Sequence, residues 1–212
     1  MIYDHSTRPT KKTAVLLQED VDLFFDFVKS ITVTGDSLIL VPAIPHSSHV
    51  NVYSKDFLYL LRQLSVSCWP EFQIYNPVTG DLIVACSDRG TVQLQSLNKN
   101  NFEGLNKNNF DENSKGSSSS LSEMNCLKVR KLITALDSPE SSSLWRPEGV
   151  ALVPGTGHFI VHDSVSKRIL LFDGEGIFLR ILLKNVECVA FTCDMKGRIW
   201  LANRFDELRV FS

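Results

Sequence analysis

The sequence has no long hydrophobic run and no excess of one charge. Its longest apolar stretches, such as residues 58–61 and 82–86, are far shorter than the about 20 residues that span a bilayer as a helix. The 22 basic and 24 acidic residues give a net charge of −2, which excludes a generally basic nucleic-acid-coating protein. The polar residues 1–5 lack the apolar core of a secretion signal. We therefore expect a cytoplasmic protein without a membrane partner.

Cysteine is scarce, and its spacing matches no known framework. There is no C-x-x-C pair and no histidine next to a cysteine, so the four-ligand spacing of a zinc finger or RING domain is missing. An odd number of cysteines argues against a disulfide framework. We interpret all five as buried thiols and expect neither a metal nor a cofactor. They are Cys68, Cys86, Cys126, Cys188 and Cys193.

Signatures of common catalytic sites are missing as well. The sequence has no G-x-S-x-G motif and no phosphate-binding glycine loop. His158 and His162 are four positions apart on an expected strand, where such residues share a face but lie about 13 Å apart, too far to bind one metal ion. We expect no enzymatic activity, no catalytic residues and no small-molecule substrate.

The sequence does contain an internal repeat. In four segments a turn with a glycine is followed by an apolar strand, a short polar turn and a second strand. The first two of these glycines, Gly35 and Gly80, are 45 positions apart, and the last two, Gly157 and Gly197, are 40 apart. A period of this size with short strands predicts a β-propeller or a similar array.

The composition of the strands indicates where each lies in a blade. Residues 82–86 are apolar on both faces, which predicts a strand between two neighbouring blades. Residues 91–95 alternate between apolar and polar side chains, which suits a more peripheral strand. Outer strands are expected at residues 57–61, 127–133 and 178–183. We predict an all-β propeller of about four four-stranded blades, in a small or incomplete ring.

The predicted domain organisation has an N-terminal tail, two groups of blades and an insertion. Residues 1–13 are the tail, residues 14–97 hold the first two blades, and residues 126–212 hold the outer strand of the second blade and the last two blades. The insertion, residues 98–125, contains a tandem duplication and a serine run, a low complexity that predicts disorder. We consider it either a phosphorylatable linker or an inert loop between the third and fourth strands of the second blade.

The two ends of the chain complement each other in this scheme. The sequence ends before the fourth blade has an outer strand, and the apolar residues 14–17 resemble an outer strand without a blade. We expect this N-terminal strand to close the ring on the last blade, since pairing removes an exposed edge. The alternative is a piece of a longer propeller whose ends meet further blades.

The third and fourth segments resemble NHL repeats, over a region of residues 145–211. The segment G-H-F-I-V-H-D resembles the family strand G-N-I-Y-V-A-D, and K-R-I-L-L-F-D resembles its closing hairpin H-R-I-Q-V-F-D. In the fourth segment Asn203 stands at the usual aspartate. The matching stretches are residues 146–152, 157–163, 167–173 with Gly176, and 197–203.

The resemblance implies an interaction platform. NHL propellers commonly have six blades and offer a broad top face to protein or RNA, most familiarly at the C-terminus of TRIM-type ubiquitin ligases. Ligase chemistry there belongs to a RING domain, so this chain would supply only recognition. The alternative is a metal-dependent lyase or lactonase, because the related amidating lyase holds zinc with histidines from several blades. Here the histidines come from two segments only: His46, His49, His158 and His162.

Basic residues in the turns of the two best repeats are the candidate partner-binding site. They can pair with RNA phosphates or can be ordinary solvated charges. Asp163 is expected to accept hydrogen bonds from turn amides and from the side chain of Arg168. Asn203 is expected to take the equivalent place in the fourth segment. Trp200 is expected to pack within the blade, and packing is also the simpler role for Trp69 and Trp145. The candidate binding residues are Arg146, Lys167, Arg168, Arg198 and Arg204, and the family comparison favours Arg146, Arg168 and Arg204.

Overall fold

A computed structural model describes seven stretches of the chain. They are residues 30–34, 38–42, 47–54, 60–97, 127–137, 145–205 and 207–212. The predicted tail, the apolar residues 14–17, the insertion 98–125 and His46 lie outside the described residues. No helix in these stretches is long and apolar enough to span a membrane.

The described strands form four antiparallel sheets, and within each sheet neighbouring strands are consecutive in the chain. A short 3-10 helix, Ala135–Asp137, lies between the second and third sheets. The first sheet contains β1 (Thr32–Val33), β2 (Leu38–Pro42), β3 (His49–Ser54) and β4 (Leu60–Ser65). The second contains β5 (Phe72–Asn76), β6 (Asp81–Cys86), β7 (Thr91–Ser96) and β8 (Lys128–Ile133). The third contains β9 (Pro147–Leu152), β10 (Phe159–Asp163), β11 (Arg168–Phe172) and β12 (Phe178–Lys184), and the fourth contains β13 (Ala190–Cys193), β14 (Ile199–Ala202) and β15 (Leu208–Phe211).

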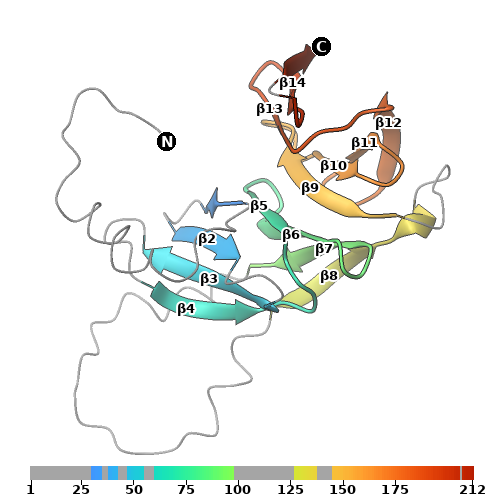
Figure 1. The fold of residues 1–212 in the computed structure, drawn as a ribbon. Coiled ribbons are helices and arrows are strands. Elements are labelled where there is room, and N and C mark those ends of the chain that lie inside the picture. Colours follow the sequence, from blue (N-terminus) through green and yellow to red (C-terminus); the bar gives the residue numbers. More distant parts are fainter. Residues whose placement is uncertain are drawn as a thin grey trace, which may run out of the picture.

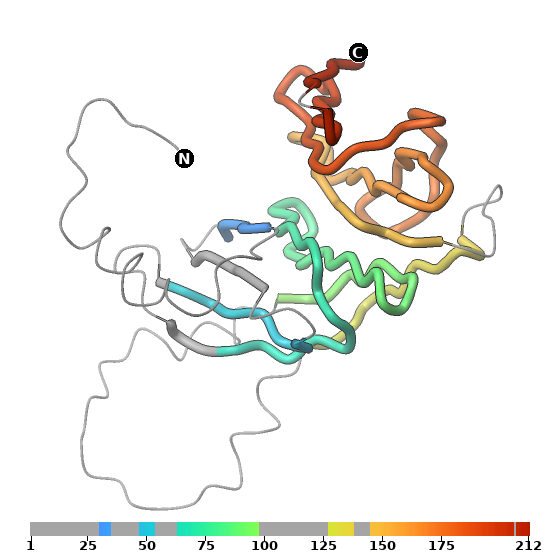
Figure 2. Tube along the Cα trace, in the orientation of Figure 1, coloured from blue at the N-terminus to red at the C-terminus, as the bar shows by residue number. Residues whose placement is uncertain are grey.

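The four sheets are the blades of a β-propeller, as the repeat predicts. In Figure 1 the first strands β1, β5 and β9 lie toward a common centre, and the last strands β4, β8 and β12 lie outside. Figure 2 shows the chain passing from one blade to the next without crossing back. Three blades have four described strands and the fourth has three.

The hydrophobic core lies between the blades. Every residue of β6 and of β10 is buried, which confirms that strands apolar on both faces are covered from both sides. The largest cluster joins Ile83 and Leu94 of the second blade to Phe159 and Phe172 of the third. The rings of Phe159 and Phe172 stack with their centroids 5.5 Å apart. Burial of these aromatic and branched side chains fixes the angle between neighbouring blades.

The repeated glycines of the second, third and fourth blades lie in the turns that precede the second strand of the blade; Gly35 of the first blade lies outside the described residues. Gly80, Gly157 and Gly197 have φ angles of +75°, +75° and +76°. An L-residue with a side chain rarely adopts this left-handed conformation, so the turn favours glycine. This backbone requirement is the physical reason for the period found in the sequence.

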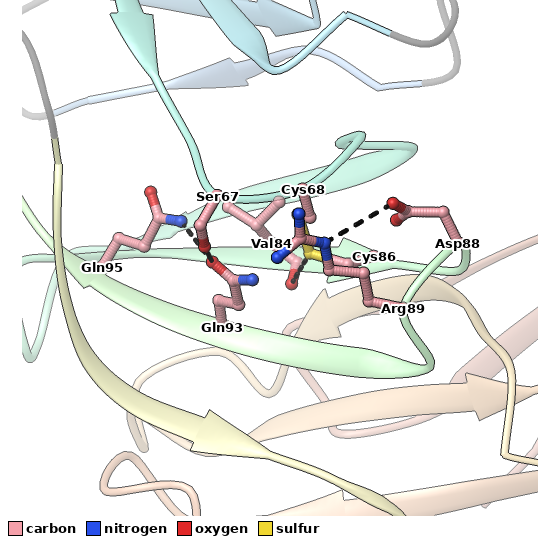
Figure 3. Close-up of a disulfide and its surroundings, with 8 residues drawn as sticks. All are labelled: Ser67, Cys68, Val84, Cys86, Asp88, Arg89, Gln93 and Gln95. Atoms are coloured by element: carbon pink, nitrogen blue, oxygen red, sulfur yellow. Dashed lines mark hydrogen bonds and ion pairs between the residues drawn. A yellow bond between two sulfur atoms is a disulfide. The ribbon is translucent and has the colours of Figure 1, made fainter.

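The strand β7 lies outside β6 in its blade, as its alternating pattern predicts, but its two glutamines are not exposed to water. Gln93 and Gln95 are buried, although they alternate with apolar residues. Gln93 Oε1 accepts hydrogen bonds from Ser67 Oγ, at 2.6 Å, and from Gln95 Nε2, at 2.8 Å (Figure 3). The connector between β4 and β5 thus covers β7 and supplies a polar partner for Gln93. The alternation of polar and apolar residues in β7 therefore does not mean that the polar ones face water.

A disulfide corrects the prediction of five thiols. Cys68, in the connector between the first two blades, is bonded to Cys86 at the end of β6, with an S–S distance of 2.02 Å and a Cα–Cα distance of 5.8 Å (Figure 3). Both residues are buried. Cys188 and Cys193 carry free thiols, and Cys126 lies outside the described residues. The pairing joins residues that are 18 positions apart and that no cysteine motif marks.

Two other predicted boundaries can be compared with the structure. The outer strand of the first blade, expected at residues 57–61, is β4 at Leu60–Ser65. The other outer strands, β8 and β12, lie where they were expected. Because β7 pairs with β8, the insertion connects the third and fourth strands of the second blade.

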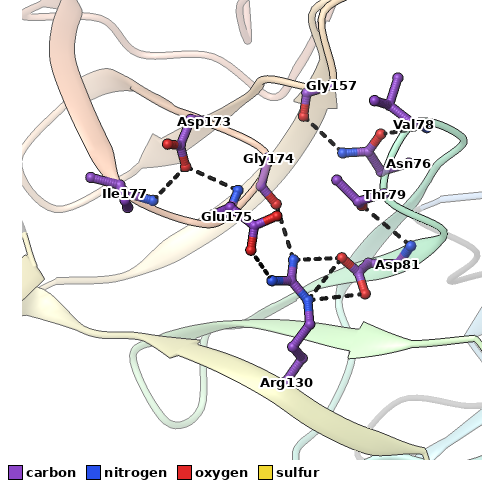
Figure 4. A network of polar contacts seen from close by, with 10 residues as sticks. All are labelled: Asn76, Val78, Thr79, Asp81, Arg130, Gly157, Asp173, Gly174, Glu175 and Ile177. Carbon is purple, nitrogen blue, oxygen red and sulfur yellow. Dashed lines mark hydrogen bonds and ion pairs between the residues drawn. The ribbon is translucent and has the colours of Figure 1, made fainter.

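Polar side chains hold the second and third blades together at one end. Asn76 Nδ2 donates a hydrogen bond to the carbonyl oxygen of Gly157, at 2.8 Å. Arg130 on β8 contacts the carboxylate of Asp81 in its own blade, at 2.6 Å, and the carboxylate of Glu175 in the next blade (Figure 4). The hydrogen bond with Asp81 is the main reason that the pKa of Arg130 lies above its ordinary value. These contacts fix the relative position of the inner strands that line the candidate site.

Candidate functional site

The loops gather at two ends of the blades, which we name by chain direction and not by the view in Figure 1. At the top face the strands β5, β9 and β13 begin, and at the bottom face they end. Hydrogen bonds from Ser164 N to Arg146 O, at 3.0 Å, and from Val186 N to Lys167 O, at 2.8 Å, tie the top loops together. The top loops are residues 66–71, 87–90, 134–137, 145–146, 164–167, 185–189, 203–205 and 207; the bottom loops are residues 77–80, 153–158, 173–177 and 194–198.

A central cavity of about 700 Å³ lies between the inner strands and opens near the top face. Side chains of β5, β9 and β13 line it, among them Gln73, Glu148 and Phe191. A side pocket of about 210 Å³ shares Glu148, His162, Cys188 and Arg204 with it. The central cavity is larger than the side pocket, and it lies where a propeller has its central channel.

Three of the predicted binding residues meet at this site. Arg146 and Arg204 line the central cavity, and Lys167 lines the side pocket together with Arg204. Arg146 comes from the loop before β9, Lys167 from the β10–β11 turn and Arg204 from the β14–β15 turn. Their convergence from two blades on the top face is what the sequence spacing alone does not reveal.

Two predicted binding residues do not belong to the site. Arg168 is a correction: its side chain is only 9% exposed, and its Nη2 lies 3.5 Å from Asp163 Oδ2, so it stabilises the blade from inside. Arg198 lies in the β13–β14 turn on the bottom face. It pairs with Asp194 at 2.7 Å and lies over the ring of Trp200, with 5.5 Å from Cζ to the ring centroid.

Acidic side chains accompany the cations of the site. Arg146 Nε lies 3.1 Å from Glu148 Oε1, and Lys167 pairs with Glu187. The hydrogen bond from Lys167 holds the pKa of Glu187 below its ordinary value, and the charge of Arg204 lowers it further. The site therefore has mixed charge and is not a continuous basic patch.

Exposed apolar side chains lie in the loops of the top face, and one of them, Val189, lines the central cavity. Phe205 is 78% exposed and Trp69 is 44% exposed, while Trp145 is buried and packs against Phe172. Within the loops that the structure describes, the top face carries five large apolar residues that are exposed and the bottom face carries three. Those of the top loops are Trp69, Leu136, Val165, Val189 and Phe205; those of the bottom loops are Val78, Ile177 and Met195.

Two titratable side chains lie deep in the site. His162 is buried beside the ring of Phe191, with centroids 6.2 Å apart, and burial lowers its pKa. Burial, together with the charge of Glu148, raises the pKa of the Cys188 thiol to about 11. A thiol of this kind is protonated at neutral pH and is a poor nucleophile.

The described side chains form no metal centre. No group of three histidine, cysteine, aspartate or glutamate residues lies close enough together in the described stretches to hold an ion. His162 faces the cavity, and His158 lies in a bottom loop and lines a different pocket. No site for the metal of the alternative lyase or lactonase function is therefore found among these residues.

Two of the predicted structural residues, Asp163 and Asn203, lie at strand ends and accept hydrogen bonds from loop amides. Asp163 Oδ1 accepts hydrogen bonds from the backbone of Arg146, at 3.1 Å, in the loop before β9, and of Ser166, at 3.4 Å, in the following turn. Asn203 Oδ1 accepts hydrogen bonds from Phe205 N and Glu207 N, at 2.8 and 3.1 Å, in the turn that follows it. Trp200 is half-buried in β14, and its Nε1 donates to Asp194. The bond from Trp200 holds the pKa of Asp194 well below its usual range.

The sequence did not predict three of the residues that line the cavity, Gln73, Glu148 and Phe191. Each is part of an inner strand, and a strand's period-two pattern does not tell the channel side from the side that meets a neighbouring blade. One signal in the sequence could have found part of the site. Glu71 and Glu148 each follow a proline and stand just before or at the start of an inner strand.

Comparison with known proteins identifies the fold. No protein-family model matches the sequence, and no curated protein sequence matches it. Among solved structures, the chain is similar to Kuenenia stuttgartiensis hydrazine synthase, with a TM-score of 0.56, 12% identity, and coverage of 91% of this chain and 52% of that one. It is also similar to BBS1N in its complex with ARL6DN, with a TM-score of 0.53, 11% identity, and coverage of 86% and 49%.

Both similarities are with propeller-like folds. This chain spans about half the length of either protein. At such low identity the likeness shows the fold alone, and it supports the β-propeller architecture described above.

Proposed function

We propose that the chain is a non-enzymatic recognition module that binds a protein partner through its top face. The observation that carries this proposal is the concentration of exposed apolar side chains there, with Trp69 and Phe205 the largest. Exposed aromatic side chains are typical anchors of protein interfaces. BBS1N, a propeller of similar fold, was crystallised in complex with another protein, ARL6DN.

A protein partner accounts for the charges better than RNA does. RNA binding draws on unpaired cations that neutralise phosphates. At this site Arg146 pairs with Glu148 and Lys167 pairs with Glu187, so two of the three cations already have acidic partners. Mixed charge around an apolar centre is instead typical of the rim of a protein interface.

The NHL type and a role beside a TRIM-type ubiquitin ligase are further parts of the proposal. They depend on the resemblance of residues 157–163 and 197–203 to NHL strands, in which Asp163 and Asn203 each accept a hydrogen bond from an amide of the following turn. In that case the chain selects a substrate for a ligase whose catalytic domain is elsewhere.

The test compares the two faces of the same molecule. The double variant W69A/F205A removes two exposed top-face anchors, and the matched control I177A/M195A removes two exposed bottom-face side chains. Proteins cross-linked to the intact chain in cell extract are quantified by mass spectrometry, and the affinity of the most enriched one is measured with purified components. We expect at least a tenfold weaker affinity for the top-face variant and an unchanged one for the control.

Three outcomes would overturn the proposal. One is equal binding by both variants, and another is a greater loss for the bottom-face variant. The third is saturable cross-linking to RNA that is lost in R146A/R204A and unchanged in W69A/F205A. This result would favour the RNA alternative.

A further inference from the structure

One edge of β15 has no partner strand among the described residues. In the first three blades the third strand pairs on both sides, with the second strand and with an outer strand, β4, β8 or β12. In the fourth blade the third strand is β15, and it pairs with β14 alone within the described stretches. Alternate residues of an antiparallel strand direct their N–H and C=O groups to opposite sides, so about half of the backbone groups of β15 are available to another strand.

A largely apolar groove lies beside this edge, between the third and fourth blades. Its volume is about 450 Å³, and we call it the outer groove. Ile181, Leu182 and Leu183 of β12 line it from the third blade, and Ile199 and Phe211 line it from the fourth. An apolar side chain that enters from the side of the free edge would therefore be buried among apolar neighbours.

The other blades show what fills this position. The cluster between the first and second blades contains Leu127, which directly precedes β8. Phe178 and Ile181 of β12 pack against the cluster between the second and third blades. In both cases the side chains come from the outer strand of the later blade or from its start. The cluster between the third and fourth blades has no such contribution within the described part of the chain, and the outer groove lies there.

The strand register defines where a new side chain would lie. Phe172 of β11 pairs with Phe159, and Phe211 of β15 pairs with the equivalent residue Ile199. On its other side Phe172 pairs with Phe178 of β12. A strand that pairs with β15 in the same antiparallel way therefore places a side chain opposite Phe211, at the outer groove.

The composition of β15 differs from that of the strands that end the other blades. The outer strands β8 and β12 carry three and two lysines or arginines, which discourage further pairing at a sheet edge. In β15, Leu208 is 63% exposed and Val210 is 45% exposed. Its one cation, Arg209, pairs with Glu207 at 2.7 Å. An edge with so little charge is suited to pairing with another chain.

The free edge is continuous with the proposed interface of the top face. The turn before β15 carries Phe205, one of the two aromatic anchors of that interface. From this turn β15 runs toward the bottom face and ends at Phe211, beside the outer groove. A segment of about six extended residues covers that path, about 20 Å. A partner that contacts Phe205 therefore lies next to the start of the edge.

We propose that an extended segment of the protein partner adds to the fourth blade as its outer strand. The segment pairs with β15 in an antiparallel way and places an apolar side chain opposite Phe211 in the outer groove. In this mode of recognition, backbone hydrogen bonds give affinity and a side-chain pocket gives selectivity. The inference rests on the proposed function, because the top face brings the partner to the start of the edge.

The experiment uses the full chain labelled with ¹⁵N and a peptide that copies an outer strand. The probe has the sequence of residues 127–133, L-K-V-R-K-L-I, with both ends blocked. In the chain alone, the amides on the free edge of β15 are expected to exchange rapidly with solvent. As the probe is added, the amide signals of β15 are expected to shift saturably, and the exchange of the edge amides is expected to slow.

Two N-methylated forms of the probe are matched controls for strand pairing. Methyl groups on alternate amides block one side of an extended peptide, and moving them by one residue blocks the other side. We expect one form to bind about tenfold more weakly, because its hydrogen bonds to β15 are lost, and the other form to bind as the unmodified probe does.

Two variants of the chain test the outer groove. F211A removes a side chain that lines the groove and is expected to bind the probe about tenfold more weakly. The control I177A changes an exposed residue of a bottom loop outside the groove and is expected to bind it normally. If F211A does not fold, the two methylated probes decide, since they leave the chain unchanged.

The strand site is overturned if the shifts do not saturate, if both methylated forms bind equally, or if a folded F211A binds as well as I177A. It is also overturned if the edge amides of β15 are protected from exchange in the chain alone, because the edge is then already paired, within the chain or with a second copy. The proposed function is judged separately by W69A/F205A. If the probe binds at β15 but the partner's affinity does not depend on the top face, the proposed function falls and the strand site stands.

Discussion

The side chain of Asn76 donates a hydrogen bond of 2.8 Å to the carbonyl oxygen of Gly157, a residue 81 positions further along the chain. Asn76 ends β5 in the second blade, and Gly157 lies in the turn before β10 in the third. The Oδ1 atom of the same side chain accepts a bond from Val78 N, at 3.1 Å. One buried amide thus holds its own turn and ties two blades together, so it contributes both to local geometry and to the shape of the cavity.

Replacing Asn76 by alanine is expected to destabilise the fold by about 1–3 kcal/mol, because it leaves the Gly157 carbonyl and the Val78 amide without their partner. The free energy of unfolding is measured by urea denaturation. The control N51A removes an amide of the first blade whose side-chain bond to Gln63 is exposed, and we expect it to cost less than half as much. An equal loss in both variants would contradict the role assigned to Asn76.

Arg130 is expected to matter for stability through Asp81 more than through Glu175. Asp81 is buried, so R130M leaves an uncompensated carboxylate inside the protein and is expected to cost about 3 kcal/mol, somewhat less if water reaches the half-exposed site. Glu175 is largely exposed, so E175Q is expected to cost at most about 1 kcal/mol. Urea denaturation of both variants checks the order. A larger loss for E175Q would show that the link to the third blade dominates.

The sequence predicts the elements of this fold that depend on local or periodic physics. Gly80, Gly157 and Gly197 mark the turns because each turn needs a positive φ. The strands β6 and β10 are recognisable because burial on both faces favours apolar side chains at successive positions, as in residues 82–86 and 159–161. Asp163 and Asn203 are also predicted as structural residues, because each side chain accepts a hydrogen bond from an amide of the turn that follows its strand.

Features that depend on a neighbouring blade could not be predicted in this way. The glutamines of β7 look solvent-facing in the sequence, and only the connector from the first blade, which brings Ser67, explains their burial. The same connector places Cys68 against Cys86. The pairing of Arg168 with Asp163, by contrast, lies within one blade and is expected from the sequence, which leaves open only how deeply Arg168 is buried. For the glutamines and the disulfide, the deciding partner is set by how segments pack, for which the sequence carries no local signal.

The disulfide is expected to stabilise the protein measurably. Its loop spans 18 residues, for which restriction of the unfolded chain gives about 3 kcal/mol. The double variant C68A/C86A is expected to unfold at a lower temperature than the unmodified chain, and a reductant should lower the unfolding temperature of the unmodified chain only. Alkylation before reduction, followed by mass spectrometry, should leave Cys68 and Cys86 unlabelled. Labelling of both under native, non-reducing conditions would contradict the bond.

Since persistent disulfides are typical of oxidising compartments, this bond weighs against the predicted cytoplasmic location.

Cys188 is expected to react slowly although it lines the central cavity. Burial raises its pKa to about 11, so almost none of it is thiolate at neutral pH. The rate of its alkylation by iodoacetamide, followed by peptide mass spectrometry, should be far below that of free cysteine at neutral pH and should still rise at about pH 10. Fast labelling at neutral pH would instead indicate a reactive thiol and would favour the enzyme alternative.

His162 is expected to make stability depend on pH. Burial lowers its pKa in the folded protein below the ordinary value of 6.5. Between 6.5 and that lower value the unfolded chain binds a proton that the folded protein does not, so stability is full above 6.5 and is lost as the pH falls through this window. The free energy of unfolding should therefore be smaller at about pH 5.5 than at about pH 7.5, and H162Q should reduce the difference. The control H158Q changes a less buried histidine in a bottom loop of the same blade and should keep it. A pH dependence that H162Q leaves intact would show that other groups cause it.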